Sequence, residues 1–241
     1  MTLPPPLPRS LPRADFFVTG TDTGVGKSLV AAALLRHLGR AGRRTVGMKP
    51  VAAGATQVDD RWCNDDVEAL SAASNVQAPA PWVCPYLLRD AMAPHIAADH
   101  AGVHLSLEHM RDCFAQLQSV SDSVVVEGAG GFSVPINATD TLADLAQVLA
   151  VPVVLVVGIR LGCLNHALLT AQAIRQAGLP LAGWVANHID PGMSAPVENV
   201  NALAQRLGAP CWGQIPWQMQ SPRFNFADGL EAIPSVIVPS Y

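Results

Sequence analysis

One short stretch near the start of the chain constrains the fold more than any other. It reads FFVTGTDTGVGKSLVAAALL from Phe16 to Leu35, and it passes from an apolar run through a glycine-rich turn into a segment rich in alanine and leucine. Glycines allow successive backbone N–H groups to point at one centre, and a following helix presents its positive end to the same place. A strand, a glycine-rich loop and a helix in this order are typical of a phosphate-binding loop.

Two side chains at the end of this loop suit a nucleotide and its metal ion. Lys27 supplies a mobile positive charge for β- and γ-phosphates, and the Ser28 hydroxyl can complete the coordination of Mg²⁺. The spacing departs from the common G-x-x-x-x-G-K-(S/T) pattern, because Thr21 stands where that pattern has its first glycine and Gly20 precedes it. A glycine-rich turn that binds nothing is the alternative, and the flanking strand and helix argue against it.

Strand and helix patterns along the chain predict an α/β fold. Four runs are rich in β-branched residues and nearly continuous in apolar character, which is typical of parallel strands buried on both faces. Their alternation with helical patterns implies a doubly wound, mostly parallel sheet flanked by helices, the three-layer sandwich of P-loop NTPases. The expected strands are Phe16–Gly20, Ser123–Gly128, Val151–Gly158 and Ala182–His188, with Arg44–Val51 and Cys211–Trp217 as weaker candidates. The expected helices are Lys27–Arg40, one from Leu107 after Ser106, one from Leu142 capped by Thr141, Asn165–Ala177 and Asn199–Leu207, with loops and short helices above the sheet at 56–102.

Composition favours one domain and excludes several classes of partner. The chain has 241 residues, of which 50% are hydrophobic, so we expect one domain over residues 15–241 after a proline-rich, disordered tail at residues 1–14. The net charge is −4 and the 15 Lys and Arg residues form no basic stripe, so no nucleic-acid partner is expected. The longest apolar run, Val151–Ile159, is too short to cross a bilayer, so no membrane is expected.

The cysteines indicate a reducing compartment. There are five, widely spaced and without a C-x-x-C pair, which argues against a disulfide framework or a zinc site. We therefore expect ordinary buried thiols, Cys163 among them, in a cytoplasmic protein.

Two acidic residues are placed to hold a metal ion that is bound to phosphates. Glu127 ends the buried run SVVVE, where an unpaired charge would be costly, and open α/β sheets bind ligands at that edge. Asp66 lies in CNDDVEAL at the expected start of a helix. Capping of this helix by Asp65 or Asp66 is the alternative to a metal ligand, and spacing alone leaves both open.

Seven motifs together resemble the dethiobiotin synthetase family. They appear in the order of that family and cover residues 16 to about 220. The phosphate loop alone is unspecific, whereas RLGCLNHALLT together with KPVAAG and EGAGG is far more specific. The motifs are GTDTGVGKS, GMKPVAAG (Gly47–Gly54), APHIAA (Ala93–Ala98), VVVEGAGG (Val124–Gly131), VVGIRLGCLNHALLTAQAI (Val156–Ile174), GWVANH (Gly183–His188) and GQIPW (Gly213–Trp217).

The resemblance implies an ATP-dependent ring closure with Mg²⁺. An amine of 7,8-diaminopelargonate (7,8-diaminononanoate) captures CO₂, supplied as CO₂ or bicarbonate, as a carbamate. ATP phosphorylates the carbamate, and the second amine closes the cyclic urea of dethiobiotin with release of ADP and phosphate. Because carbamate and triphosphate are both anions, the site must supply positive charge that is already in place.

By the same resemblance, the catalytic pair is Lys27 and Lys49, and the metal ligands are Ser28, Asp66 and Glu127. Lys49 in KPVAAG is expected to contact the carbamate and the transferred phosphoryl group; a surface lysine after a short strand is the alternative. The expected substrate contacts are Thr23, Lys49, Ala53, Gly130, Gly131 and Asn165, the last from the partner chain of a homodimer with sites near the subunit interface. The expected nucleotide contacts are Thr23, Gly24, Val25, Gly26, Lys27, Ser28, Glu127, Gly128, Ala129, Gly130, Asn187, His188, Pro216, Trp217 and Gln218, with Asn187 reading the adenine edge.

Three positions depart from residues that occur in the family. Ala53 stands where some members have serine, Gly24 where some have glutamate, and His188 where an aspartate often follows the asparagine. These departures bear on details of carbamate and nucleotide contact and leave the lysines and metal ligands untouched. The role of His95 in APHIAA stays open.

Three other functions share the loop architecture. A partition- or division-type ATPase switch is the main alternative, although such proteins usually carry a second lysine at the position of Thr21, and the chain has no terminal amphipathic helix. A corrin-amidating synthetase would need an attached glutamine-hydrolysing domain, for which the chain is too short. A nucleotide-binding module without catalysis is disfavoured because Lys27, Lys49, Asp66 and Glu127 are all present.

Overall fold

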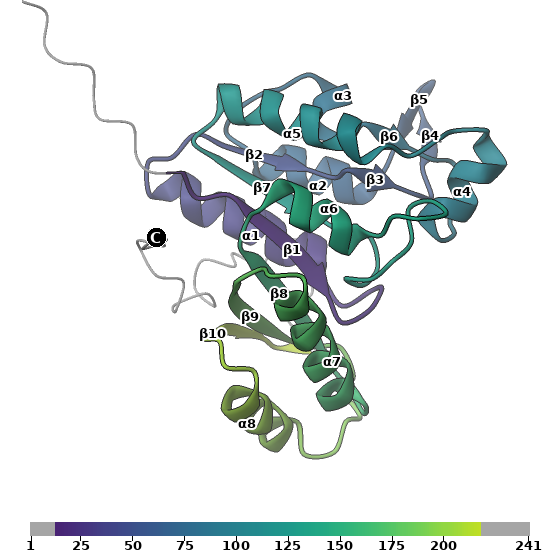
Figure 1. The fold of residues 1–241 in the computed structure, drawn as a ribbon. Helices are drawn as coiled ribbons and strands as arrows, with labels where there is room; N and C mark the ends of the chain where they lie inside the picture. Colours follow the sequence, from purple (N-terminus) through teal and green to yellow (C-terminus); the bar gives the residue numbers. More distant parts are fainter. Residues whose placement is uncertain (1–12, 218–241) are drawn as a thin grey trace, which may run out of the picture.

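A computed structural model describes residues 13–217, in which a parallel sheet of six strands lies between two layers of helices (Figure 1). The strand order is β10-β9-β8-β1-β7-β2, and every neighbouring pair is parallel. The chain therefore runs from β1 to the edge strand β2 and returns to β7 between them. It then crosses to β8 on the other side of β1 and continues through β9 to β10. The strands are β1 (Phe16–Gly20), β2 (Thr45–Met48), β7 (Ser123–Glu127), β8 (Val153–Ile159), β9 (Leu181–His188) and β10 (Cys211–Ile215).

Two apolar layers hold the helices against the sheet. On one face, α1 and α2 bury Leu34, Leu35 and Leu70 against side chains of β1, β7 and β8. On the other face, α5 and α6 cover β1, β2 and β7, and α7 and α8 cover β8 and β9. The helices are α1 (Lys27–Arg40), α2 (Asp65–Ala73), α3 (Ala80–Val83), α4 (Pro94–Ala101), α5 (Leu107–Val120), α6 (Leu142–Leu149), α7 (Cys163–Gln176) and α8 (Pro196–Arg206).

The predicted three-layer α/β sandwich is confirmed, and local capping explains where several helices begin. Ser106 caps α5 by accepting from the His109 N–H, and Thr141 caps α6 in a reciprocal pair with Asp144. Two helices start earlier than expected. α7 begins at Cys163, after Gly162 with φ of 94°, and α8 begins at Pro196, a residue whose fixed φ suits the first helical position.

The segments before and within 56–102 differ most from expectation. The predicted strand Arg44–Val51 is two strands: β2 stays in the main sheet, whereas β3 (Val51–Ala52) pairs with β6 (Tyr86–Leu87) in a separate sheet. A hairpin of β4 (Thr56–Val58) and β5 (Arg61–Cys63) follows. The interpretation of 56–102 as loops and short helices above the sheet misses α2, which belongs to a main helical layer because it packs on α1 and β2.

The folded part begins at least two residues before the predicted boundary at Asp15. The Arg13 guanidinium pairs with Asp15 and donates to the carbonyls of Gln118 and Ser121, and Ala14 is buried. Residues 1–12 and 218–241 lie outside the described residues, so the assignment of residues 15–241 to one domain stays a prediction.

The structure tests the expectation that the cysteines are buried thiols. All five cysteines are free thiols; Cys113 and Cys163 are buried, whereas Cys63, Cys84 and Cys211 are partly exposed, so the expectation of buried thiols holds for only two of them.

Within residues 13–217, no helix has both the length and the apolar character needed to cross a membrane.

Candidate active site

The phosphate loop connects β1 to α1 at the point where the sheet changes winding direction. Gly24 and Gly26 have φ of 74° and 92°, which strongly favours glycine. A Cβ at Gly26 would lie 2.3 Å from Nδ2 of Asn187, which donates to the carbonyl of Val25. The hydroxyl of Thr21 accepts from the Gly158 N–H, so the residue that replaces the usual glycine ties the loop to β8.

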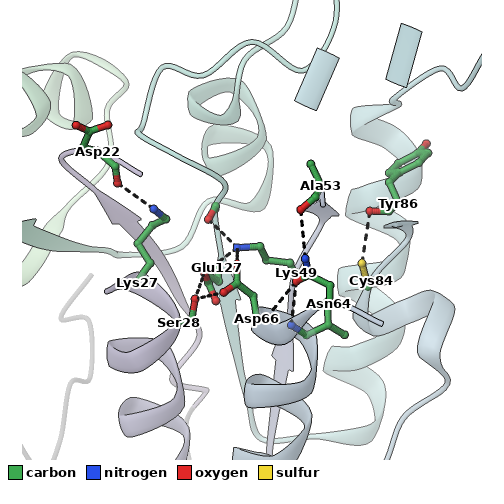
Figure 2. Close-up of polar contacts among 12 residues, drawn as sticks. Asp22, Lys27, Ser28, Lys49, Ala53, Asn64, Asp66, Cys84, Tyr86 and Glu127 are labelled. Carbon is green, nitrogen blue, oxygen red and sulfur yellow. Dashed lines mark hydrogen bonds and ion pairs between the residues drawn. The ribbon is translucent and has the colours of Figure 1, made fainter. Parts of the chain in front are cut away.

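A buried ammonium group lies between two carboxylates at the carboxyl edge of the sheet (Figure 2). Lys49 follows β2, and its Nζ lies 2.7 Å from Oδ2 of Asp66 and 2.7 Å from Oε1 of Glu127. Glu127 ends β7, the strand adjacent to β2, and Asp66 lies in the first turn of α2. Lys49 is 3% exposed and Glu127 is 1% exposed, so the pairing compensates charges that water does not reach.

The same carboxylates meet the hydroxyl at the start of α1. Oγ of Ser28 lies 2.5 Å from Oδ1 of Asp66 and 2.8 Å from Oε1 of Glu127, and it has one proton to donate. Oε2 of Glu127 is buried and has no hydrogen-bond partner in the described part of the chain. A hydroxyl and two carboxylates, one with an unpartnered buried oxygen, are the hard oxygen ligands that Mg²⁺ takes together with waters and phosphate oxygens, so these residues can hold Mg²⁺.

Burial and ion pairing shift the pKa values of Glu127, Asp66 and Lys49 in different directions. Burial raises the pKa of Glu127 despite the attraction of Lys49. Burial opposes ionisation of Asp66 and Lys49 as well. The attraction of Lys49 outweighs burial at Asp66 and lowers its pKa, whereas the attraction of Glu127 and Asp66 outweighs burial at Lys49 and raises its pKa. Lys49 is therefore a fixed positive charge, held by the carboxylates that face it.

The second lysine has a different environment. Nζ of Lys27 donates to the carbonyl of Asp22 at 3.0 Å, and the side chain has no carboxylate in direct contact in the described structure. Burial and the nearby charge of Lys49 lower the pKa of Lys27 to about 8. An anion placed beside Lys27 would restore its charge.

Both lysines line one cavity of about 750 Å³. Its polar lining consists of residues of the phosphate loop, Ser28, Asp66 and Glu127. Its apolar lining includes Val51, Ala53, Ala91, Met92, Ala93, Pro94 and Val134. A cavity lined by both charged and apolar side chains suits two charged reactants, one of which carries a hydrocarbon chain.

The structure brings together most of the residues proposed from the sequence. Thr23, Gly24, Gly26, Lys27, Ser28, Lys49, Ala53, Asp66, Glu127, Ala129 and Gly130 all line the cavity. Gly128 contributes a carbonyl 3.4 Å from Nζ of Lys49. A Cβ at Gly130 would lie 3.1 Å from Val134, and the φ of Gly130 is 68°; Gly131 follows it at the same edge.

Other proposed residues lie outside this cavity. Asn187 is buried at the end of β9, and its Oδ1 has no partner among the described residues, whereas His188 contacts Gln214. Asn165 is exposed in the first turn of α7. Pro216 and Trp217 follow β10, with Trp217 partly exposed, and Gln218 lies outside the described residues.

Sequence reasoning missed residues that position the site. Neither Asp65 nor Asp66 caps α2: the cap is Asn64, whose Oδ1 accepts from the Asp66 N–H at 3.1 Å. The sequence carried a signal for this, because asparagine is among the preferred N-cap residues. The ion pair of Arg160 with Asp22 of the phosphate loop joins residues far apart in the sequence and had no such signal. Nδ1 of His95 is buried without a partner in the described structure, and the role of His95 stays open.

Comparisons with known proteins place these features in context. A family model described as "AAA domain" matches residues 14–223. The ATP-dependent dethiobiotin synthetase BioD of Xanthomonas oryzae pv. oryzae (strain PXO99A) is 50% identical over 216 residues, which is 90% of this chain and 96% of that protein. The ATP-dependent dethiobiotin synthetase BioD of Janthinobacterium sp. (strain Marseille) is 50% identical over 204 residues, which is 83% of this chain and 86% of that protein.

A solved structure gives the same fold at much lower identity. The septum site-determining protein MinD from Pyrococcus horikoshii OT3, complexed with Mg-ADP, superposes with a TM-score of 0.54 and 18% identity over 86% of this chain and 82% of that chain. At this identity the likeness extends to the fold alone.

The lowered pKa of Lys27 predicts proton uptake when a nucleotide binds. At pH 8 the free protein has Lys27 about half deprotonated, and an adjacent phosphate restores the charge, so binding of Mg·ADP takes up about 0.5 proton from the buffer. Titration calorimetry in buffers of different ionisation enthalpy measures this uptake. The uptake decreases below pH 7, where Lys27 is already charged.

The Lys27→Arg variant is the control, because arginine stays protonated over this pH range. It is expected to bind Mg·ADP without the uptake at pH 8. Equal uptake in the variant and the wild type would contradict the assignment to Lys27.

Proposed function

This chain belongs to the AAA-domain family and to the ATP-dependent dethiobiotin synthetases, and we propose that its cavity binds 7,8-diaminopelargonate, CO₂ and Mg·ATP for closure of the dethiobiotin ring. The chain is an ATP-dependent ligase that forms C–N bonds. The observation that carries the proposal is that Lys27, Lys49 and the oxygen cluster line one cavity together with apolar side chains. A partition-type ATPase switch is not favoured, because the relatives at 50% identity are synthetases.

The proposed reaction balances over three steps. One amine of the diamine attacks CO₂, forms a carbamate and releases a proton. The carbamate oxygen attacks the γ-phosphorus of ATP, which gives a carbamic–phosphoric anhydride and ADP. The second amine attacks the carbamate carbon, closes the cyclic urea, loses a proton and expels phosphate.

Positive charge is the main contribution of the protein to the second step. Carbamate and triphosphate repel each other, and preorganised cations at the site offset this repulsion without reorganisation during the reaction. In our proposal, Lys27 contacts the β- and γ-phosphates, and Lys49 contacts the carbamate and the transferred phosphoryl group. Support comes from their burial beside one cavity and from the charge that Lys49 keeps next to two carboxylates.

We propose that Ser28, Asp66 and Glu127 hold Mg²⁺. Bound there, Mg²⁺ would supply further neutralising charge at the phosphate oxygens. The three side chains suit this role because their oxygens converge within hydrogen-bond distance and one Glu127 oxygen lacks a partner in the described chain.

The apolar lining suits the hydrocarbon chain of the diamine. Met92, Ala93, Pro94, Val51 and Ala53 contribute apolar groups to the cavity lining. We propose that the reacting amines lie near Thr23, Lys49, Ala53, Gly130 and Gly131. At Ala53 the wall offers a methyl group in place of a hydroxyl, so a hydroxyl contact to the carbamate is not made there.

Nucleotide recognition is proposed to combine the phosphate loop with the end of β9. The Asn187 amide nitrogen is occupied by the Val25 carbonyl, which leaves Oδ1 as an unpartnered buried acceptor within the described structure. An acceptor suits the exocyclic amino group of adenine. Backbone groups at Pro216 and Trp217 are proposed to lie along the base, with His188, whose ring contacts the side chain of Gln214, beside them.

A homodimer would explain the exposed apolar residues beside Asn165. Leu161 is 91% exposed in the turn before α7, and Leu169 is 57% exposed on α7. Monomeric proteins cover most such side chains when they cluster. We propose that this surface contacts a second copy of the chain, so that Asn165 of each copy can reach the substrate carboxylate in the other.

Five free thiols agree with a cytoplasmic location, which we also propose.

The wild-type protein is expected to make dethiobiotin from the diamine, bicarbonate, Mg²⁺ and ATP, as detected by mass spectrometry. The Lys49→Ala variant is expected to lose at least about 10²-fold in rate, which is the scale for removal of one preorganised charge-stabilising group. A wild type without product would refute the proposed reaction. A fully active variant would refute only the role of Lys49.

The proposed dimer surface is tested by the Leu161→Glu variant. A buried, unpaired carboxylate at the interface is expected to shift the sedimentation mass from dimer to monomer, because the charge must be desolvated on association. The control is Val58→Glu, which places the same charge at a residue of β4 that is 50% exposed. Dimers in both variants, or monomers in both, would contradict an interface at Leu161.

A further inference from the structure

Asn64 uses both ends of its side-chain amide, and each end reaches a different part of the site (Figure 2). Its Oδ1 accepts from the backbone N–H groups of Asp66 at 3.1 Å and Val67 at 3.4 Å, which caps α2. Its Nδ2 donates to the carbonyl of Ala53 at 3.2 Å. One amide thus joins the start of α2 to Ala53, the residue directly after β3.

These two segments carry charged groups that must face each other. Asp66 belongs to the first turn of α2, and Lys49 lies four residues before Ala53 in the other segment. The ion pair between Lys49 and Asp66 spans the same gap as the Asn64 bridge. The side chain of Asn64 joins the backbone N–H of Asp66 to the backbone carbonyl of Ala53. This bridge therefore does not depend on which anion the Lys49 ammonium contacts.

The chain between Ala53 and Asn64 does not by itself fix their separation. Gly54 and Ala55 are hydrogen-bonded to Asp90 and Leu88, and the rest is the hairpin β4–β5, whose strands have three residues each and are mostly exposed. A two-stranded hairpin of this size is marginally stable in water. The amide of Asn64 joins the two ends of this segment through its contact with the Ala53 carbonyl.

We propose that Asn64 is a positioning residue that sets the distance between Asp66 and the Lys49–Ala53 segment. This inference rests on the proposed function, in which Asp66 binds Mg²⁺ and Lys49 contacts the carbamate. The Oδ1 end orients the first turn of α2 and with it the Asp66 carboxylate. The Nδ2 end keeps that turn against the substrate wall at Ala53.

The test separates the two ends of the amide. Asn64→Ser keeps a good helix cap but lacks the Nδ2 donor, whereas Asn64→Ala lacks both. Binding of Mn²⁺ in the presence of ADP, followed by electron paramagnetic resonance, reports the metal site without any turnover. Both variants are expected to raise the Mn²⁺ dissociation constant about tenfold, the scale for loss of an outer partner of a metal ligand. Only Asn64→Ala is expected to lower the melting temperature by several degrees.

Asn75 supplies a matched control at the other end of α2. Its Oδ1 accepts from the Thr45 N–H at 2.7 Å and its Nδ2 donates to the Arg43 carbonyl at 2.8 Å, so it is a second two-ended amide that is remote from the cavity. Asn75→Ser is expected to leave the Mn²⁺ dissociation constant unchanged.

Three results would overturn the inference. If Asn64→Ser binds Mn²⁺ as the wild type does, the Nδ2 end positions nothing. If Asn75→Ser weakens Mn²⁺ binding equally, the effect is a general loosening of α2. A wild type that binds no Mn²⁺ with ADP overturns the proposed metal site itself, and that failure is distinct from a wild type that binds Mn²⁺ but makes no dethiobiotin.

Discussion

The site depends on one buried ammonium group that faces two carboxylates. Lys49 and Glu127 are almost fully buried, and such charges are tolerated only when each has a close partner of opposite sign. The partners come from the ends of β2 and β7 and from the first turn of α2, and the adjacent position of β2 and β7 in the sheet brings the first two together. Packing of α2 on α1 and β2 supplies the third.

This arrangement divides the work between the two lysines. Lys49 is held as a cation by its carboxylate partners, whereas Lys27 contacts a backbone carbonyl and has a lowered pKa near 8. The carboxylates that stabilise Lys49 also converge on Ser28 as oxygen donors. A single constellation therefore supplies both the fixed cation and the oxygen ligands that our proposal gives to Mg²⁺.

Local patterns in the sequence predicted much of this site, and contacts between distant segments account for the rest. The position of Glu127 at the carboxyl end of a buried strand predicted a cation beside it, and the order of strand, loop and helix predicted the position of Lys27 at the start of α1. The burial and lowered pKa of Lys27 were not predicted. The partners of Lys49 depend on the strand order, which no local pattern specifies. The sequence also left open whether Asp66 caps α2, because Asn64, Asp65 and Asp66 are all capable caps, and only the folded chain distinguishes them.

The coupling between Lys49 and Glu127 is measured most directly by a double-mutant cycle on the free energy of unfolding. Lys49→Met should cost about 3 kcal/mol at pH 7, because it leaves buried Glu127 uncompensated. Glu127→Gln in the same chain should recover part of that loss and give an interaction free energy of at least about 1 kcal/mol. Losses that add to within about 0.5 kcal/mol would contradict the account, because the two charges would then not depend on each other.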